Sequence, residues 1–226
     1  MCGRYALTLP NDAMARLFRA QPANDLPAVP NYNICPTDPV HVVHLGAAGR
    51  RLVPMRWGFI PAWYDSPTAG PLLINARAET LADKPAFRAA CRDRRCLLVA
   101  SGFYEWRRRA ETRLPWYIFR RDGAPLALGG IWQSWGAETP QPTCAIVTTP
   151  ANRRLAPVHD RMPLILEPQD WPLWLGEAGP GAARLMRPAA EDVLDLHRVR
   201  PRVNSNRATG PDLIEELIEP FDADDD

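Results

Sequence analysis

The chain has 226 residues, of which 46% are hydrophobic and 23% charged, and its formal net charge is +1, an ordinary composition for a globular protein. No apolar run reaches the ~18 residues of a membrane span, and the N-terminus lacks the basic start and apolar stretch of a secretory signal, so we expect a cytoplasmic protein with no membrane partner. Its five cysteines are then expected to be reduced.

The N-terminal part of the chain predicts short strands separated by one helix and one long loop. Alternating or apolar runs predict strands at 3–8, 40–45 and 51–59. A helix that Asn11 or Asp12 can cap follows the first strand and places Met14 and Phe18 on one face. Residues 21–39 are rich in proline and asparagine and are predicted as a loop.

The rest of the chain predicts a larger set of strands with short helices around them. Apolar or aromatic runs predict strands at 96–106, 114–121, 126–135, 143–149 and 163–168. Short helices are predicted at 84–92, with Pro85 in the first turn, and at 169–176, 189–196 and 211–218. We therefore predict a single α+β domain over residues 1–220, with a mainly antiparallel, partly barrel-like β-sheet core and short flanking helices. An acidic tail at 221–226 is predicted to be disordered.

The small net charge hides an asymmetry between the body of the chain and its end. Residues 1–206 carry 26 bases and 18 acids, a net charge of +8, whereas one base and eight acids follow. A basic body favours polyanionic partners, although charged side chains also serve simply to solvate a surface. Lys84 is the only lysine, so almost all the bases are arginines, which suit phosphate binding and base stacking.

The second residue has the most distinctive chemistry in the chain. Removal of Met1 would leave Cys2 with an α-amine and a thiol on one residue, a 1,2-aminothiol. An α-amine titrates near ~7.7–8.0, so part of it is neutral and nucleophilic at physiological pH, and the thiolate is a strong nucleophile. With an aldehyde the amine forms a Schiff base, and the thiol then closes on the imine carbon to give a five-membered thiazolidine. An internal cysteine cannot make this product.

Three further side chains are candidates for the same chemistry. Glu105 ends an apolar strand between aromatic residues, so burial could raise its pKa into the range of a general acid. His159 could transfer protons near neutral pH, and Asn75 offers an amide that could orient a reactant. Taken singly, each has an ordinary structural explanation as an ion-pair partner, a loop residue or a turn residue.

No cofactor or metal site is predicted. Cys91 and Cys96 are too isolated for a two-pair zinc site, and His41 and His44 lie on a predicted strand. The chain also lacks a glycine-rich phosphate loop and a GxSxG nucleophile turn.

Several motifs, in order, carry a resemblance to one family. They are MCGRY at 1–5, NYNICPT at 31–37, WGFIPAW at 57–63, INARAET at 74–80, GFYEW at 102–106, HDRMP at 159–163 and VNSNRATGPDLIE at 203–215. This set resembles the SRAP-domain family, the "SOS response-associated peptidases", whose members act as sensors of abasic sites in single-stranded DNA. The resemblance covers residues 1 to about 220, and the order of the motifs is highly specific.

The resemblance implies a covalent mechanism in DNA repair. Cys2 would capture the aldehyde of an abasic site as a thiazolidine and so shield the lesion from strand cleavage. By the same resemblance, Asn75 would position the amine and the sugar, Glu105 would act as acid and base, and His159 would assist proton transfer or reversal. No cofactor is implied.

The resemblance also implies DNA contacts around these groups. Phosphates would be held by Arg4, Arg77 and Arg161. Asn33, Pro36 and Trp106 would line the site, and Trp63 with Tyr64 would form a stacking loop for bases. Cys35, next to Pro36, is a second thiol that could pair with Cys2 under oxidation or be inert.

Other readings of the N-terminus stay open from the sequence. Met-Cys-Gly also begins class II glutamine amidotransferases, in which the freed cysteine hydrolyses glutamine. A thiol peptidase that removes its own Met1 and a non-covalent DNA-binding module are two more. With the covalent reading, the expected partners are single-stranded DNA with abasic sites and proteins of the replication fork, and we expect a monomer that joins the nucleoid when bound to DNA.

Overall fold

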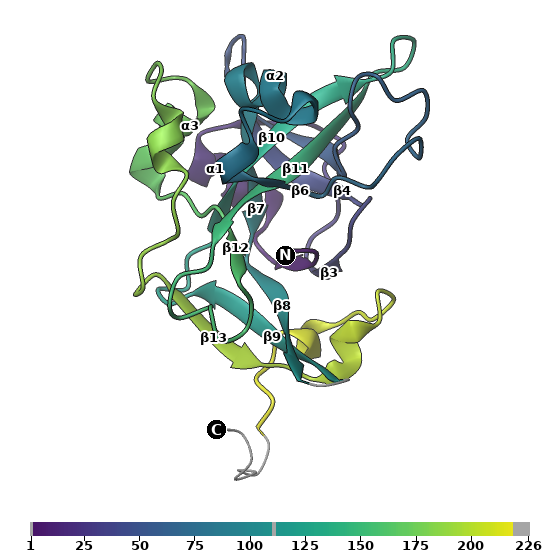
Figure 1. Cartoon of the computed structure of the whole chain (residues 1–226). Coiled ribbons are helices and arrows are strands. Elements are labelled where there is room, and N and C mark those ends of the chain that lie inside the picture. Colours follow the sequence, from purple (N-terminus) through teal and green to yellow (C-terminus); the bar gives the residue numbers. More distant parts are fainter. Residues whose placement is uncertain (1, 110–111, 219–226) are drawn as a thin grey trace.

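The computed structural model describes residues 2–109 and 112–218, which form two β-sheets with three short α-helices around them (Figure 1). The smaller sheet lies at the bottom of the view and the larger one above it, with the helices on the outside of the larger sheet. One continuous core of buried side chains runs from Cys2 to Leu194 and joins the two sheets. The predicted α+β class with a mainly antiparallel sheet is confirmed.

The smaller sheet has five strands. Their order in space is β13 (Leu194–Arg198), β9 (Thr112–Arg120), β8 (Gly102–Arg109), β1 (Tyr5–Leu7) and β3 (Asn31–Ile34). All four pairings are antiparallel, and β1 is held between β8 and β3. The start of the chain is therefore enclosed by strands that lie far from it in sequence.

The larger sheet closes into a ring. Its strands are β12 (Arg161–Pro163), β11 (Gln141–Pro150), β10 (Leu126–Trp135), β7 (Arg95–Ala100), β4 (Pro39–Gly46), β5 (Gly49–Trp57) and β2 (Gln21–Pro22). A parallel pairing of β5 with β11, with Cys144 opposite Trp57, joins the two ends of the antiparallel run. The short strand β6 (Asn75–Arg77) adds to β11 in parallel. Inside the ring, β10 and β7 pack so closely that only glycine fits at position 130, because a Cβ there would lie 2.4 Å from Leu98 Cδ1.

The run 96–106, predicted as one strand, is two strands in different sheets. The chain changes sheet at Ser101, between β7 and β8, where the Ser101 hydroxyl accepts a hydrogen bond from the Thr8 N–H at 2.9 Å. The Ser101 N–H donates to Ala6 O at 2.7 Å. Both halves are buried and apolar, so hydrophobicity alone does not mark the change.

The helices follow ordinary local rules. They are α1 (Asn11–Phe18), α2 (Pro85–Asp93) and α3 (Trp171–Leu175). The α1 helix buries Met14 and Phe18, as predicted, and α2 begins with Pro85, whose missing N–H costs nothing in the first turn. The α2 helix packs against β7 and β10, and α3 packs against β7. Apolar faces therefore cover the outside of the ring.

Four further predicted segments are wrong or incomplete. The loop 21–39 contains β2 and β3. No helix forms at 189–196, and the last part of that segment, from Leu194, belongs to β13, because pairing with β9 overrides the local helix propensity. The strand predicted at 163–168 ends at Pro163, apart from an isolated bridge between Ile165 and Leu128. The helix predicted at 211–218 is only a 3-10 turn at Pro211–Leu213. The predicted tail at 221–226 lies outside the described residues.

In the part of the chain that the structure describes, no helix is long and apolar enough to cross a membrane. Nor do three or more His, Cys, Asp or Glu side chains of the described residues gather in a way that could hold a metal ion.

The stability of the ring is expected to depend on Leu98. This side chain is fully buried in β7, with Val42 of β4 and Leu128 of β10 as its neighbours in register. Because Leu98→Ala leaves a cavity, it is expected to lower the free energy of unfolding by about 2–5 kcal/mol, measured by urea denaturation. Leu17→Ala, at a position on α1 that is 41% exposed, should change it by no more than about 0.5 kcal/mol. Equal losses in the two variants would contradict the packing described for the ring.

Candidate functional site

Four candidate side chains come from four separate segments. Cys2 precedes β1, Asn75 begins β6, Glu105 lies in the middle of β8, and His159 lies in the loop between β11 and β12. The pairings of β1 with β8 and of β6 with β11 bring these segments together at the junction of the two sheets. The sequence-predicted group is thus one site in space.

Cys2 is fully buried and is held by Asn75. The Asn75 side-chain amide donates a hydrogen bond to the Cys2 carbonyl at 2.8 Å. Burial raises the pKa of the Cys2 thiol, and the nearby Glu105 carboxylate acts in the same direction. The oxygen of the same Asn75 amide, Oδ1, is buried and has no hydrogen-bond partner among the described residues. The Asn75 amide therefore fixes the Cys2 backbone and keeps one acceptor for a further donor.

Glu105 is a buried acid. Only 2% of its surface is exposed, and burial raises the pKa of its carboxyl to about 7. In the antiparallel pairing with β9 it lies opposite Trp116, with Tyr104 and Trp106 on either side of it in β8. A carboxyl with a pKa near 7 can both donate and accept a proton at neutral pH, as general acid–base catalysis requires.

His159 faces Glu105 with a defined nitrogen. His159 Nδ1 lies 2.9 Å from the Arg161 backbone nitrogen and 3.2 Å from the Arg161 carbonyl oxygen, so the backbone of Arg161 holds this side of the ring and Nε2 is turned toward Glu105. His159 Nε2 lies 3.9 Å from Glu105 Oε2. On the other side, Asp160 Oδ1 lies 3.1 Å from Nδ1 and would stabilise the doubly protonated ring. At 3.9 Å the imidazole and the Glu105 carboxyl are at ion-pair distance and not hydrogen-bonded, so a protonated ring would stabilise the Glu105 carboxylate.

Arg161 is tied to a carboxylate that sequence reasoning missed. Its guanidinium makes a two-point ion pair with Glu79, at 2.6 and 3.0 Å, and donates to Thr148 O at 2.7 Å. The Arg161 side chain is 12% exposed, whereas that of Glu79 is 46% exposed. A phosphate that binds Arg161 must therefore compete with Glu79. Arg77, by contrast, is exposed at the end of β6.

Arg4, Asn33 and Trp106 form a second group beside Cys2. Arg4 Nη1 donates to Asn33 Oδ1 at 2.7 Å and to Val203 O at 3.1 Å, and its guanidinium lies 5.8 Å from the centre of the Trp106 ring. Asn33 donates to the Ala208 carbonyl at 2.7 Å. These contacts fix Arg4 in the wall of a small pocket of about 270 Å³ that Gly3, Trp106, Arg113 and Asn204 also line.

The predicted stacking loop has one projecting ring. Trp63 is 58% exposed, whereas Tyr64 is half-buried and its hydroxyl lies against Gly70, where an added Cβ would come within 2.1 Å of it. Tyr64 also accepts a hydrogen bond from Trp135 Nε1 at its carbonyl, at 2.9 Å. Tyr64 thus holds the loop in shape and Trp63 is presented to solvent.

Pro36 and Cys35 lie at the edge of this region, both half-buried. Cys35 is a free thiol that points at the carbonyls of Asn33 and Asn206, at 3.3 and 3.8 Å. Burial raises the pKa of the Cys35 thiol, which makes it a weak nucleophile.

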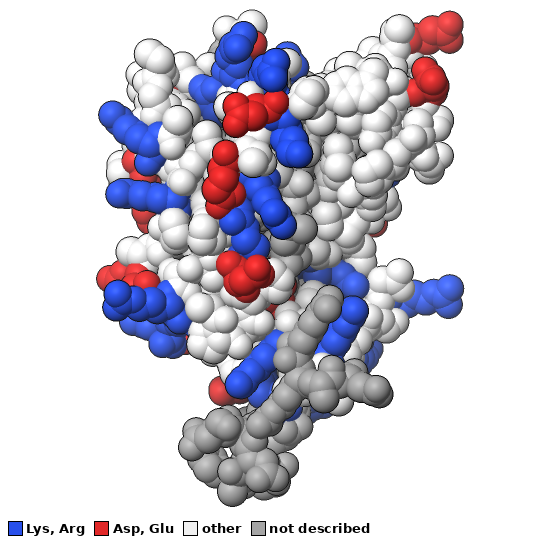
Figure 2. Space-filling view, in the orientation of Figure 1, with Lys and Arg blue, Asp and Glu red and all other residues white. Residues whose placement is uncertain are grey.

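Charged side chains mark the face in front of β6 and β8. Figure 2 shows basic side chains in a band down the middle of this face, with acidic side chains among them, whereas the surface to the right of the band is mostly uncharged. Glu79 and Arg161 illustrate this mixing, because a phosphate that binds Arg161 has to displace the Glu79 carboxylate.

Comparison with known proteins gives the family. A family model described as "SOS response associated peptidase (SRAP)" matches residues 1–206. The chain belongs to the SRAP family. It is 33% identical to "Abasic site processing protein YoqW" of Bacillus subtilis, over 95% of this chain and 99% of that protein. It is also 31% identical to "Abasic site processing protein YedK" of Escherichia coli, with the same two shares.

A further relative agrees with this assignment, and a solved structure shares the fold. "Abasic site processing protein HMCES" of Rattus norvegicus is 30% identical, over 95% of this chain and 75% of that protein. A crystal structure of a protein from Bacteroides thetaiotaomicron superposes with a TM-score of 0.85 at 22% identity, over 96% of this chain and all of the other, which shows the shared fold.

Within this SRAP chain, sequence reasoning missed three site residues. Glu79 and Lys84 flank the site from the segment after β6, and Asn204 accepts a hydrogen bond from Trp106 Nε1 at 2.6 Å. Glu79 and Asn204 lie inside the quoted motifs INARAET and VNSNRATGPDLIE, so the motifs contained the signal but did not show which side chains they contact.

Proposed function

We propose that this protein binds single-stranded DNA at abasic sites and captures the lesion covalently through Cys2. The relatives named above as abasic site processing proteins support the lesion as substrate. The observation that supports this chemistry is that three side chains surround Cys2. Asn75 holds the Cys2 backbone by a hydrogen bond, and Glu105, which faces His159, is close enough to raise the pKa of the Cys2 thiol. That arrangement suits a nucleophile at the N-terminus.

The first step is formation of an imine. Once Met1 is removed, the neutral α-amine of Cys2 attacks the aldehyde carbon of the ring-opened sugar, and the carbinolamine loses water to give a C=N bond. Protonated Glu105 can donate the proton that the departing hydroxyl needs, because burial holds the pKa of its carboxyl at about 7. Asn75 Oδ1, which is buried without a hydrogen-bond partner among the described residues, would accept a hydrogen bond from the attacking amine.

The second step closes the ring. The Cys2 sulfur bonds to the imine carbon, the C=N pair of electrons moves to nitrogen, and the thiol proton passes to that nitrogen. Burial raises the pKa of the thiol, so a free thiolate is disfavoured in the empty site. The Glu105 carboxylate, which has just lost its proton, can take the thiol proton and pass it to that nitrogen, and a protonated His159 ring, 3.9 Å away, would stabilise the carboxylate.

The test of the proposal uses DNA with one lesion. Mature protein is incubated with single-stranded DNA that carries one abasic site and is run on a denaturing gel, with intact DNA of the same sequence as control. A band that survives denaturation and forms only with the abasic strand is the expected result. If both strands bind non-covalently and no such band forms, the protein is a DNA-binding module without covalent chemistry. Release of ammonia from glutamine would instead indicate an amidotransferase.

We further propose that the peptidase activity in the family name includes removal of Met1. Intact mass spectrometry of the protein made in vitro without methionine aminopeptidase tests this. Loss of the mass of Met1 in the wild type but not in Glu105→Gln would support removal by the protein itself. Retention of Met1 in both would show that another enzyme exposes Cys2.

Glu79 is expected to weaken non-covalent DNA binding. Glu79→Gln leaves Arg161 free to bind a phosphate, so the affinity for intact single-stranded DNA should rise about 2- to 5-fold, because a half-exposed ion pair contributes at most about 1 kcal/mol. Fluorescence anisotropy at fixed salt measures this. Glu138→Gln, an exposed position between β10 and β11, makes the same change in net charge. Equal gains in both variants would mean a general charge effect and no competition at Arg161.

A further inference from the structure

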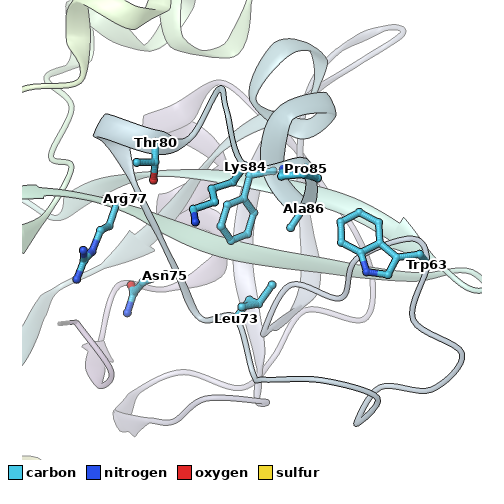
Figure 3. Close-up of a pocket in the computed structure, with 9 residues that line it drawn as sticks. Trp63, Leu73, Asn75, Arg77, Thr80, Lys84, Pro85 and Ala86 are labelled. Atoms are coloured by element: carbon cyan, nitrogen blue, oxygen red, sulfur yellow. The ribbon is translucent and has the colours of Figure 1, made fainter.

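His159 lies in a loop, whereas Asn75 and Glu105 lie in strands. Asn75 begins β6, at one end of a pocket of about 580 Å³ that has Trp63 at its other end (Figure 3). Glu105 is fixed in the middle of β8 by the pairing of that strand with β9. The loop that carries His159, residues 151–160, runs between β11 and β12, and none of the described strands pairs with it. What fixes this loop therefore decides where the imidazole lies.

One buried amide ties this loop to another part of the chain. Asn152 is 5% exposed, and its side-chain nitrogen donates hydrogen bonds to the carbonyls of Ala189 and Ala190, at 3.2 and 3.4 Å. Its Oδ1 accepts the backbone N–H of Leu155 at 3.0 Å. The two N–H groups and the oxygen of the amide are thus all used, the first for the segment before β13 and the second for the loop itself.

The bond to Leu155 leads directly to His159. Leu155 is 1% exposed and packs in the core that joins the two sheets. Its carbonyl accepts the backbone N–H of His159 at 3.0 Å, and a bond from the Ala151 N–H to the Asp160 carbonyl, at 2.9 Å, closes the ends of the loop. Two hydrogen bonds in series, through Leu155, therefore connect the Asn152 side chain to the backbone of His159.

The position of the imidazole matters because its contact with Glu105 is loose. His159 Nε2 lies 3.9 Å from Glu105 Oε2, so this contact does not fix the ring as a hydrogen bond would. A charge interaction weakens as the separation grows, and a displacement of about 1 Å at a reacting group can slow a reaction about 100-fold. The backbone of Arg161 holds the Nδ1 side of the ring, at 2.9 and 3.2 Å, and the loop holds the backbone of His159.

We propose that Asn152 is a positioning residue for the crosslinking reaction, which holds the loop 151–160 so that His159 stays beside Glu105. The inference rests on the proposed function and deepens it, because it adds a residue that acts through His159 and not on the reacting atoms. Asparagine suits this role, since its amide offers two donors and an acceptor on a short side chain. The acceptor holds the loop, and the donors hold the anchor at 189–190.

Two substitutions of Asn152 separate positioning from folding. Serine removes the donors to Ala189 and Ala190 but keeps an oxygen that can accept the Leu155 N–H, because serine and asparagine both accept an N–H three residues further along. Alanine removes all three hydrogen bonds. The thermal midpoint should fall in both variants, whereas crosslinking to the abasic strand should slow about 10- to 100-fold only in Asn152→Ala. Single-turnover rates at a temperature below both midpoints measure this. A rate in Asn152→Ser as low as that in Asn152→Ala would overturn the proposal.

A double-mutant cycle tests whether the effect passes through His159. Asn152→Ala is combined with His159→Gln, and the four crosslinking rates are compared. Because glutamine leaves no imidazole to misplace, Asn152→Ala should slow the His159→Gln protein by less than about 2-fold. Losses that multiply in the double variant would overturn the proposal, as would a wild-type rate in Asn152→Ala. If the wild type itself forms no covalent band, the proposed function fails and this inference with it, whereas multiplying losses contradict the inference alone.

Glu191→Ala is the matched control. The Glu191 carboxylate, at an exposed position, accepts the backbone N–H groups of Arg153 and Arg154 at 3.1 and 3.2 Å. It therefore ties the same loop to the same segment, but through these two residues rather than through Leu155. The crosslinking rate of Glu191→Ala should stay within about 2-fold of the wild-type rate. An equal loss in Glu191→Ala and Asn152→Ala would mean that any loosening of the loop slows the reaction, and would overturn a specific role of Asn152.

Discussion

Cys2→Ala is expected to remove the persistent crosslink to abasic DNA completely. Without the thiol, the second step cannot form the C–S bond, and the remaining imine is hydrolysed under denaturing conditions. The substitution removes only one sulfur atom from a fully buried position, so we expect a small loss of stability. A denaturing gel with an excess of protein over abasic strand measures the crosslink.

The same variant allows the two steps to be separated. Borohydride reduces an imine to a stable amine, so Cys2→Ala should give a covalent band only when borohydride is present, whereas wild-type protein needs no reductant. Acetylation of the α-amine of the wild type should prevent both bands. Cys91→Ala, a half-buried thiol on α2, is the matched control and should crosslink normally. A stable band from Cys2→Ala without borohydride would contradict the thiazolidine.

Glu105→Gln is expected to slow crosslinking by about 100-fold or more. The glutamine keeps the size of the side chain but can neither donate nor accept a proton in the two steps, and general acid–base catalysis contributes about 10²- to 10⁴-fold. Because burial disfavours the carboxylate and raises the pKa of Glu105 to about 7, the acid form is present below about pH 7 and is lost above it. The α-amine behaves in the opposite sense, since only its neutral form, present above about 7.7–8.0, attacks.

These two groups together predict the pH profile. The wild-type crosslinking rate should rise with pH as the amine loses its proton, pass a maximum between about pH 7 and 8, and fall as Glu105 loses its proton. In Glu105→Gln the falling limb should disappear. Single-turnover rates from pH 5.5 to 9.5 measure this. The control is Glu177→Gln, because the Glu177 carboxylate is not one of the site groups and pairs instead with Arg50. A falling limb that persists in Glu105→Gln would show that another group is the acid.

The sequence was most informative where the chemistry is local. The aminothiol of Cys2 depends on one residue and its position, and the apolar surroundings of Glu105 in GFYEW are sufficient to predict burial and a raised pKa, which the structure has. The α1 and α2 helices also follow local rules, since the apolar face of α1 and Pro85 at the start of α2 are visible in the sequence.

Pairing over long distances could not be predicted in this way. Glu79 lies 82 residues from its partner Arg161, and nothing in the local pattern connects them. The helix predicted at 189–196 has a helical composition, yet its end becomes β13 because β9 offers a free edge. Likewise, the chain passes from the larger to the smaller sheet at Ser101, between two buried stretches that hydrophobicity alone does not separate. Such features depend on where other segments lie, which composition and periodicity do not report.

The enclosure of β1 by β8 and β3 sets an order of events during synthesis. Tyr5 pairs with Phe103, so the first strand has no β8 to join until about 100 further residues have been made, which takes about 5–20 s at about 5–20 residues per second. During that interval the nascent end is open to enzymes that trim it, and after folding the Cys2 side chain is fully buried. The rate of synthesis thus limits the time in which another enzyme can remove Met1 before folding, whereas removal by the protein itself has to follow folding, because only the pairing of β1 with β8 brings Glu105 near Cys2.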